Sequence, residues 1–268
     1  PLVSGSPLIN AAVAFQRGEI LGVVPKSYLP SYKEFQEERW FTASSHLQQS
    51  MITIGNREVP LDCYLIFEYD EVRVGIEICE DLWVVSPPSD KLAAAGALVI
   101  VNCSAGDEII GKADYRKRIT EVQSAKNICA YLYCGAGEGE STSDMVFSGH
   151  CFVYENGTLL AEKAPFDYAN DMLITEIDLG RLLYDRRRVN SFCAGNAAHS
   201  GLFVDLALVH AGDVILHRVL QRHEVRFLIC KLLQHGAHRR GFTRTGRAHN
   251  QNHAAAVFEQ RIILLQVC

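Results

Sequence analysis

Short apolar runs, separated by glycine, proline and polar clusters, fill the first 180 residues and predict a protein rich in strands. Residues 8–15 and 20–24 predict a hairpin that turns at Arg17-Gly18, because glycine supplies the turn. Residues 63–68 and 72–78 predict a second hairpin. Polar residues between the two hairpins predict a loop or a short helix, followed by a surface connection.

The centre of the chain alternates between helical and strand patterns. The wholly apolar runs 98–102 and 129–134 are typical of strands buried on both faces. A helix over 90–96, capped by Ser89, precedes the first run, and helical spacing over 112–128 precedes the second. Further strands are predicted at 145–154, 158–162 and 172–177. Hairpins mixed with βαβ steps predict a layered α/β fold.

Two reactive side chains directly follow predicted strands. Lys26 comes after the strand 20–24, and Cys79 comes after the strand 72–78. Because α/β enzymes carry reactive groups at the carboxyl ends of strands, Cys79 is a candidate nucleophile. An ordinary thiol has a pKa of about 8.5 and needs a nearby cation or base to ionise near neutrality. Lys26 can supply that charge.

Composition narrows the protein class. The chain has 268 residues, of which 48% are hydrophobic, and no uninterrupted apolar run is long enough to cross a bilayer. Nine cysteines without a Cys-x-x-Cys pair favour a reducing compartment, and we expect the cytoplasm. The basic run 186–188 predicts a solvated helix end, so we expect no nucleic-acid or membrane partner. The cysteine and histidine spacings predict no metal site.

Charge changes sign near residue 194. Residues 1–194 carry a net charge of −10, residues 195–268 carry +5, and eight of the ten histidines lie in the second part. We therefore divide the chain into a domain, 1–193, and a tail, 194–268, that fits no fold. Our hypothesis is that the tail is an out-of-frame or foreign translation, which the other reading frames after codon 193 would test.

Several motifs carry a resemblance to a known family, in matching order and spacing over about residues 8–193. They are Val24-Pro-Lys26-Ser-Tyr-Leu-Pro30, Gly75-Ile-Glu-Ile-Cys79-Glu-Asp-Leu-Trp83, Gln123-Ser-Ala125, Gly137-Glu-Gly-Glu-Ser-Thr142 and Glu155-Asn-Gly157. The chain resembles the glutaminase domain of glutamine-dependent NAD synthetases, in the nitrilase superfamily of carbon–nitrogen hydrolases. The resemblance implies a four-layer α-β-β-α sandwich that hydrolyses the side-chain amide of glutamine through a cysteine thioester.

The resemblance also implies roles for individual residues. Cys79 is the expected nucleophile, Lys26 the expected catalytic cation, and Glu37 a supporting acid in the catalytic group. The expected substrate-binding residues are Tyr32, Phe35, Glu80, Trp83, Gly106 and Lys112. Glutamine is the expected substrate, no cofactor is expected for its hydrolysis, and a homo-oligomer is expected.

The chain departs from the family pattern in three places. The family's general base is a glutamate well upstream of the lysine, so we expect an N-terminally truncated domain and do not give that role to Glu37. A family serine in an Asn-x-Ser-x-Ser run is replaced by Gly106, in Asn102-Cys-Ser-Ala-Gly106. The Ser-Gly-Gly-x-Asp-Ser loop of the synthetase domain, which would use ATP and Mg²⁺, does not occur.

Two other functions remain open. The chain could be a catalytically silent assembly domain, in which case Cys79 would not react with a glutamine-like electrophile. It could also act on another amide or on a nitrile, although the Glu80-Asp-Leu-Trp83 continuation is typical of the synthetase branch.

Overall fold

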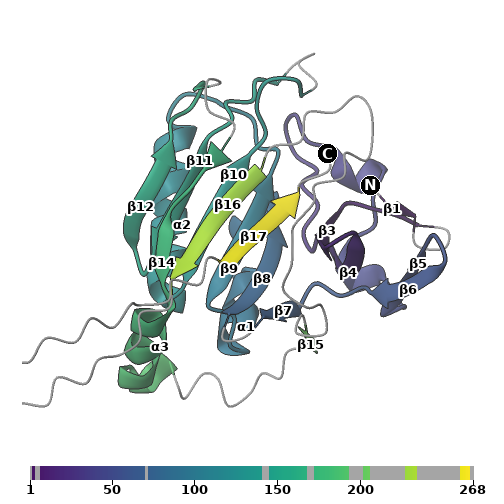
Figure 1. Ribbon diagram of the computed structural model, residues 1–268. Helices are drawn as coiled ribbons and strands as arrows, with labels where there is room; N and C mark the ends of the chain where they lie inside the picture. The colour runs from purple at the N-terminus through teal and green to yellow at the C-terminus, as the bar shows by residue number, and fades with distance from the viewer. Residues whose placement is uncertain are drawn as a thin grey trace, which may run out of the picture.

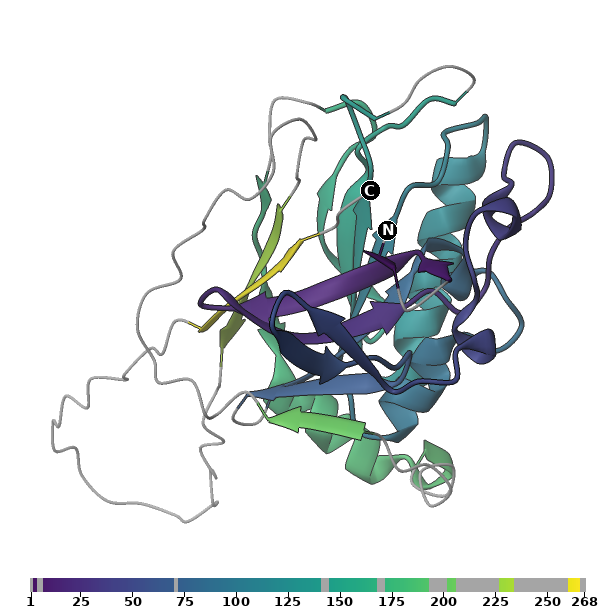
Figure 2. The same ribbon diagram turned by 90° about the vertical axis from the view of Figure 1, so that its right-hand side faces the viewer.

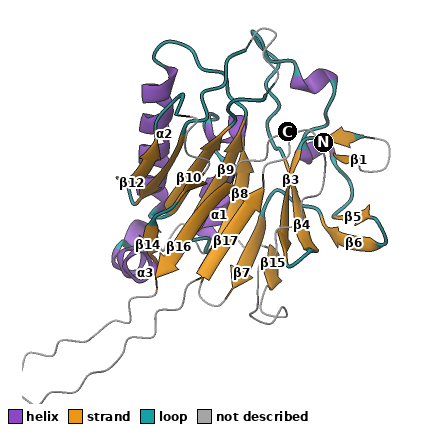
Figure 3. Ribbon diagram, turned by 45° about the horizontal axis from the view of Figure 1, so that its top comes forward, coloured by secondary structure: helices purple, strands orange, loops and turns teal. Residues whose placement is uncertain are grey.

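The computed structural model describes residues 2–3, 7–69, 72–140, 145–167, 172–192, 202–205, 227–233 and 260–265. Two β-sheets pack face to face, and helices cover the outer side of the larger sheet (Figures 1 and 2). The two sheets and the helical layer are distinct when the strands and helices are coloured separately (Figure 3).

The larger sheet has seven strands in the order β12-β11-β10-β9-β8-β7-β15. The three central strands, β8, β9 and β10, are parallel to one another, and each is followed by a segment that leaves the carboxyl edge of the sheet. The bounds are β7 Leu65–Tyr69, β8 Val72–Ile78, β9 Val99–Ser104, β10 Ala130–Gly135, β11 Cys151–Glu155, β12 Thr158–Lys163 and β15 Leu202–Asp205.

Helices α1 (Pro88–Ala94) and α2 (Lys112–Asn127) cover one face of this sheet, over an apolar cluster that includes Ile100, Tyr131 and Phe152. Gly75 of β8 faces α1, where an added Cβ would lie 3.0 Å from Leu92. Its missing side chain therefore lets the helix approach the strand closely. Helix α3 (Leu179–Arg188) packs against the end of the sheet sandwich through its buried Leu179 and Leu182.

The second sheet has the order β13-β16-β17-β3-β4, and β14 also pairs with β16. Side chains of β3, β4 and β8, among them Ala12, Val24 and Ile76, fill the core between the two sheets. The bounds are β3 Ala11–Gln16, β4 Glu19–Pro25, β13 Met172–Leu173, β14 Glu176–Asp178, β16 Phe227–Leu233 and β17 Gln260–Leu265. Three strands, β15, β16 and β17, lie within residues 194–268, and the rest of that tail is outside the described residues.

A small hairpin covers the outer face of β3 and β4. It consists of β5 (Met51–Ile54) and β6 (Arg57–Pro60), whose Ile52 and Val59 pack on Ile9 and Val23. Among the described residues this hairpin, rather than a helix, occupies the place of the fourth predicted layer. The remaining short elements are β1 Leu2–Val3, β2 Leu8–Ile9, and the 3₁₀ helices η1 Glu37–Arg39, η2 Ser44–His46 and η3 Cys79–Leu82.

Most predicted elements are present. Strands β3 and β4 pair around Arg17 and Gly18, whose φ angles of 53° and 79° make the expected left-handed turn. Strand β11 begins only at Cys151, so the prediction of a strand from residue 145 was too long. Ser89 was predicted as a helix cap, but it lies inside α1 and is 0% exposed. Its backbone N–H instead donates to a carboxylate described below.

No helix in the described part of the chain is both long and apolar enough to cross a membrane. The basic run at 186–188 differs from its prediction at one position. Arg187 and Arg188 are exposed, as expected, whereas Arg186 is buried and donates to backbone carbonyls of α1 and α2 and the turns after them.

Candidate functional site

Cys79 lies at the turn from β8 into η3, at the carboxyl edge of the larger sheet. Its φ angle is +48°, a left-handed conformation that side chains other than glycine adopt only at an energetic cost. The residue is 9% exposed, and its backbone N–H donates to Asn102 Oδ1 at 3.1 Å. A strained turn of this kind at a strand end is typical of residues held for function.

Lys26 follows β4 of the second sheet and is 1% exposed. Its Nζ donates to both carboxylate oxygens of Glu37, at 2.6 and 2.7 Å. A buried ammonium is stable only when it is paired, and Glu37 supplies this pairing. Glu37 is therefore in contact with Lys26, as a supporting acid would be.

A buried carboxylate links the two loops that carry Lys26 and Cys79. Asp81 Oδ1 accepts hydrogen bonds from the backbone N–H groups of Ser27 and Tyr28, at 3.1 and 2.9 Å. Its Oδ2 accepts from the N–H of Ile78 at 2.9 Å. The residue after Lys26 and the residue before Cys79 are thus held by one side chain. Burial raises the pKa of Asp81 to about 7.

Tyr32 and Glu80 form one side of the surroundings of Cys79. The Tyr32 hydroxyl donates to the Glu80 carboxylate at 2.9 Å, and burial together with this hydrogen bond raises the pKa of Tyr32. Glu80 directly follows Cys79 in η3, so this hydrogen bond lies beside the candidate nucleophile. Tyr32 also packs edge to face on Phe35, with ring centroids 6.2 Å apart.

Lys112, at the start of α2, forms the other side. Its ammonium lies 5.6 Å from the ring centroid of Phe35 and 5.8 Å from that of Trp83, within the range of cation–π attraction. It also forms an ion pair with Asp107. Trp83 in turn stacks on Tyr115, with centroids 5.4 Å apart. Five of the six predicted substrate-binding residues therefore belong to two contact groups at this edge.

Gly106, the sixth, lies in the loop after β9 next to Asp107. An added Cβ would lie 3.5 Å from Ser104 Oγ and 3.8 Å from the Tyr133 hydroxyl, which are ordinary contact distances. The site therefore has space for the serine of the family pattern at this position. The functional roles of all nine residues stay predictions.

Sequence reasoning missed a buried polar layer behind Cys79. Asn102 and Tyr131, both 0% exposed, connect the backbone of Cys79 to the carboxylate of Glu77. One signal for this layer was available, because Glu77 is an acid inside an otherwise apolar strand, and buried carboxylates require partners. Asn102 and Tyr131 lie in buried strands, and the residues next to them in the sequence give no sign of their hydrogen-bond partners.

A second buried network lies beside this layer. Arg116, which is 2% exposed, donates through Nη2 to Glu108 and to His150 Nδ1, both at 2.7 Å. His150 Nε2 then donates to Glu162 at 2.9 Å. Burial lowers the pKa of His150, so the ring is neutral at pH 7, with its proton on Nε2. Ser148 Oγ also donates to Glu108, at 2.6 Å, so the network joins α2 to β12 and to the segment before β11.

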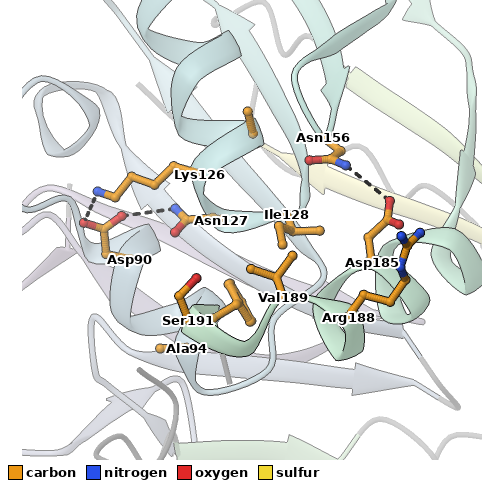
Figure 4. Close-up of a pocket in the computed structure, with 12 residues that line it drawn as sticks. Asp90, Ala94, Lys126, Asn127, Ile128, Asn156, Asp185, Arg188, Val189 and Ser191 are labelled. Carbon is orange, nitrogen blue, oxygen red and sulfur yellow. Dashed lines mark hydrogen bonds and ion pairs between the residues drawn. The ribbon is translucent and has the colours of Figure 1, made fainter. Parts of the chain in front are cut away.

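A pocket of about 820 Å³ lies at the opposite end of the larger sheet, between the ends of α1, α2 and α3 (Figure 4). Two of its carboxylates bind other side chains of the wall: Lys126 pairs with Asp90, and the Asn156 amide donates to Asp185. It lies at the amino end of β10, away from Cys79, and none of the described residues that line it is a cysteine. Within the described ranges, no three His, Cys, Asp or Glu side chains are grouped to hold a metal ion.

Comparison with known proteins finds both similar sequences and similar solved structures. The chain is 38% identical over 236 residues to the glutamine-dependent NAD(+) synthetase of Mycobacterium tuberculosis, a match that covers 82% of this chain and 35% of that protein. It therefore spans about a third of the length of the curated relatives it matches. No protein-family model matches the chain.

Two solved structures share the fold. A glutamine-dependent NAD(+) synthetase from Cytophaga hutchinsonii has a TM-score of 0.54 and 22% identity, covering 62% of this chain and 26% of that chain. A carbon–nitrogen hydrolase from Helicobacter pylori has a TM-score of 0.50 and 20% identity, covering 68% and 61%. These likenesses confirm the predicted nitrilase-type α/β fold.

Proposed function

We propose that the chain hydrolyses the side-chain amide of glutamine, because it is similar in sequence to part of a glutamine-dependent NAD(+) synthetase and shares the fold of a carbon–nitrogen hydrolase. The observation that carries the proposal is the link between two features, one from each sheet. Cys79 occupies a strained turn, and the buried Lys26–Glu37 ion pair is tied to that turn through Asp81.

In the proposed reaction the Cys79 thiolate attacks the amide carbon, and the carbonyl oxygen becomes an oxyanion. Lys26 stabilises both negative charges, a type of interaction worth about 3–4 kcal/mol per donor in acyl-transfer enzymes. The carbon–nitrogen bond then breaks, and the nitrogen takes up the proton that the Cys79 thiol gave up and leaves as ammonia. Water attacks the resulting thioester, which releases glutamate and restores the thiol. Glu37 holds Lys26 in place and is not assigned the role of general base.

The charges at the site edge suit the amino-acid end of glutamine. Lys112 provides a cation for the α-carboxylate, and Glu80, oriented by Tyr32, provides an anion for the α-ammonium group. Phe35 and Trp83 pack around the methylene carbons between these charges and the amide. This arrangement favours glutamine over a nitrile or a simple amide, which carries no charged end.

The proposed product is ammonia for the amidation of deamido-NAD. That second reaction would use ATP and Mg²⁺ in a synthetase domain, which is the proposed partner. Hydrolysis itself needs no cofactor, because thiol, ammonium and water supply each bond that forms or breaks. We propose a cytoplasmic location because the nine cysteines include no Cys-x-x-Cys pair, and a homo-oligomeric state on the resemblance alone.

The test is a glutaminase assay on the full chain that measures glutamate and ammonia together. We expect equal amounts of both products, and we expect Cys79→Ala to lower turnover by at least about 10³-fold, as loss of a nucleophile does elsewhere. Cys129→Ala is the matched control, because Cys129 is buried at the far end of β10. A glutamine-like electrophile should label Cys79.

Two outcomes would overturn the proposal. Absence of both turnover and labelling in the folded wild-type chain would favour the silent assembly domain. Turnover of nitriles or simple amides at rates above that of glutamine would favour the other substrate class.

A further inference from the structure

A continuous chain of buried hydrogen bonds leads from the backbone of Cys79 to a carboxylate two residues earlier. The Cys79 N–H donates to Asn102 Oδ1 at 3.1 Å, and Asn102 Nδ2 donates to the Tyr131 hydroxyl, also at 3.1 Å. The Tyr131 hydroxyl donates to Glu77 Oε1. These side chains are at most 1% exposed, so no water replaces a missing partner.

The far end of this series of hydrogen bonds, at Glu77, is anchored by residues of α1 and α2. Glu77 Oε2 accepts from the backbone N–H of Ser89 at 2.8 Å, and the Ser89 side chain also donates to Glu77. Gln123 Nε2 donates to Ser89 Oγ at 2.8 Å, which leaves the Ser89 hydroxyl proton for Glu77. The Glu77 carboxylate therefore acts only as an acceptor.

The backbone N–H groups at the two ends, those of Cys79 and Ser89, determine which group donates in every hydrogen bond between them. A backbone N–H can only donate, so Glu77 must accept from Ser89, and Asn102 must turn its oxygen toward Cys79. Asn102 then has only its NH₂ group for Tyr131, and Tyr131 has only its proton for Glu77. Burial raises the pKa of Glu77, and its hydrogen bonds from Tyr131 and Ser89 lower it. With Oε1 accepting from Tyr131 and Oε2 accepting from Ser89, the Glu77 carboxyl satisfies all members at once.

We propose that Glu77, acting through Tyr131 and Asn102, is a positioning residue that holds the Cys79 backbone in its left-handed conformation and so aims the thiol. Asn102 is the direct contact, and the carboxylate fixes which way the Asn102 amide faces. Loss of the carboxylate turns the amide and releases the Cys79 N–H. The effect on turnover rests on the proposed glutamine hydrolysis, whereas the effect on the Cys79 amide does not.

The primary test is the substitution Glu77→Gln, which reverses the donor and acceptor directions of these hydrogen bonds. The new oxygen must face Ser89, so the new NH₂ group faces Tyr131 and competes with the NH₂ of Asn102. The Tyr131 proton is then satisfied only if Asn102 flips, which points the Asn102 NH₂ at the Cys79 N–H. We expect the Cys79 amide hydrogen to exchange with solvent at least about fivefold faster, as for loss of one net hydrogen bond.

A second substitution should restore matched hydrogen bonds between Cys79 and position 77. In the double variant Glu77→Gln/Asn102→Asp, the new NH₂ at position 77 donates to Tyr131, Tyr131 donates to the new carboxylate, and this carboxylate accepts from Cys79. All donors and acceptors match again, with one negative charge in total. We expect amide protection at Cys79 to return to the wild-type level. Asn102→Asp alone places two carboxylates on one hydroxyl and should have the lowest melting temperature.

If the variants at positions 77 and 102 fold poorly, Tyr131→Phe tests the same proposal, because it removes the hydroxyl between Asn102 and Glu77. Its matched control is Tyr154→Phe, because Tyr131 and Tyr154 are direct partners across β10 and β11 and belong to the same apolar cluster. We expect faster exchange at Cys79 in Tyr131→Phe and less than a twofold change in Tyr154→Phe.

The measurement is residue-specific exchange in protein labelled with ¹⁵N-cysteine, in which the Cys79 signal is assigned by its loss in Cys79→Ser. Equal Cys79 exchange in Tyr131→Phe and Tyr154→Phe, or no recovery in a folded double variant, would overturn the proposal. If the wild type hydrolyses glutamine, Glu77→Gln should lower kcat and leave KM within about twofold. If the wild type does not hydrolyse glutamine, the glutaminase proposal fails, and the exchange data still test whether Glu77 positions the Cys79 backbone.

Discussion

Replacing Arg186 with leucine should remove one of the main links between α3 and the rest of the domain. The Arg186 guanidinium donates to Ala97 O at 2.7 Å, to Asn127 O and Ile128 O at 2.9 Å, and to Ala93 O at 3.3 Å. These carbonyls belong to the carboxyl ends of α1 and α2 and to the turns that follow. Carbonyls at a helix end lack most of their helical partners, and a cation there is favourable. Of these four, Ala93 O also accepts from the N–H of Gly96 at 3.0 Å.

The expected loss follows from the number of carbonyls left without a donor. Burial lowers the pKa of Arg186 to about 10, so the side chain is protonated at pH 7 and all four hydrogen bonds are charge-assisted. The pocket of Figure 4 adjoins Asn127 and Ile128, so water can reach these two carbonyls in the variant. Ala93 O keeps the N–H of Gly96 as a donor, so among the four carbonyls that of Ala97 stays unpaired, at about 1–3 kcal/mol, and we expect a loss of about 2 kcal/mol in unfolding free energy.

Urea unfolding at pH 7 measures this difference as a shift in midpoint at constant slope. Arg187→Leu is the matched control, because Arg187 is the exposed neighbour with the same charge, and its replacement should change stability by less than about 0.5 kcal/mol. Arg186→Lys, which keeps the charge and loses donors, should lie between the two. Equal midpoints for the Arg186→Leu and Arg187→Leu variants would refute the reasoning.

Two further predictions concern Asp81 and Gly135. The pKa of Asp81 is about 7 in the folded chain against 3.8 for an ordinary aspartate, so folding takes up a proton between these values. The free energy of unfolding should therefore fall as the pH rises from about 4 to about 7, by at most about 4 kcal/mol, and then level off. Subtracting the profile of Asp81→Asn isolates this contribution, and a flat difference would contradict it. An added Cβ at Gly135 would lie 2.6 Å from the backbone oxygen of His150, whereas one at Gly22 would lie 2.8 Å from the end of the flexible Leu65 side chain. Gly135→Ala should therefore be less stable than Gly22→Ala by at least about 1 kcal/mol in the same urea assay.

Local sequence signals were sufficient for most of the fold. The turns at Arg17-Gly18 and Asn156-Gly157 both have left-handed backbones, which glycine and asparagine mark in the sequence. The buried runs of β9 and β10 are apolar along nearly their whole length, so their burial was predictable. The hairpin of β5 and β6 was missed, although Gly55-Asn56 between alternating residues is a usable turn signal.

The buried polar contacts were not predictable in the same way, because their partners are distant in sequence and often lie in the backbone. Ser89 has the residue type of a helix cap, yet its N–H is taken by Glu77, twelve residues earlier. Arg186 reads as one of three surface arginines, since the carbonyls that bind it carry no mark in the sequence. Asp81 stands in the acidic run after Cys79, and only the fold shows that it holds Ser27 and Tyr28.

The candidate nucleophile and the candidate cation come from different sheets: Cys79 follows β8 of the larger sheet, and Lys26 follows β4 of the second. The distance between them is therefore set by how the two sheets dock, through core residues such as Val24, Phe67 and Ile76. A repacked core could leave both residues intact and each sheet well folded, yet misalign thiol and ammonium. The rate of the proposed hydrolysis would then report on the spacing between the two sheets.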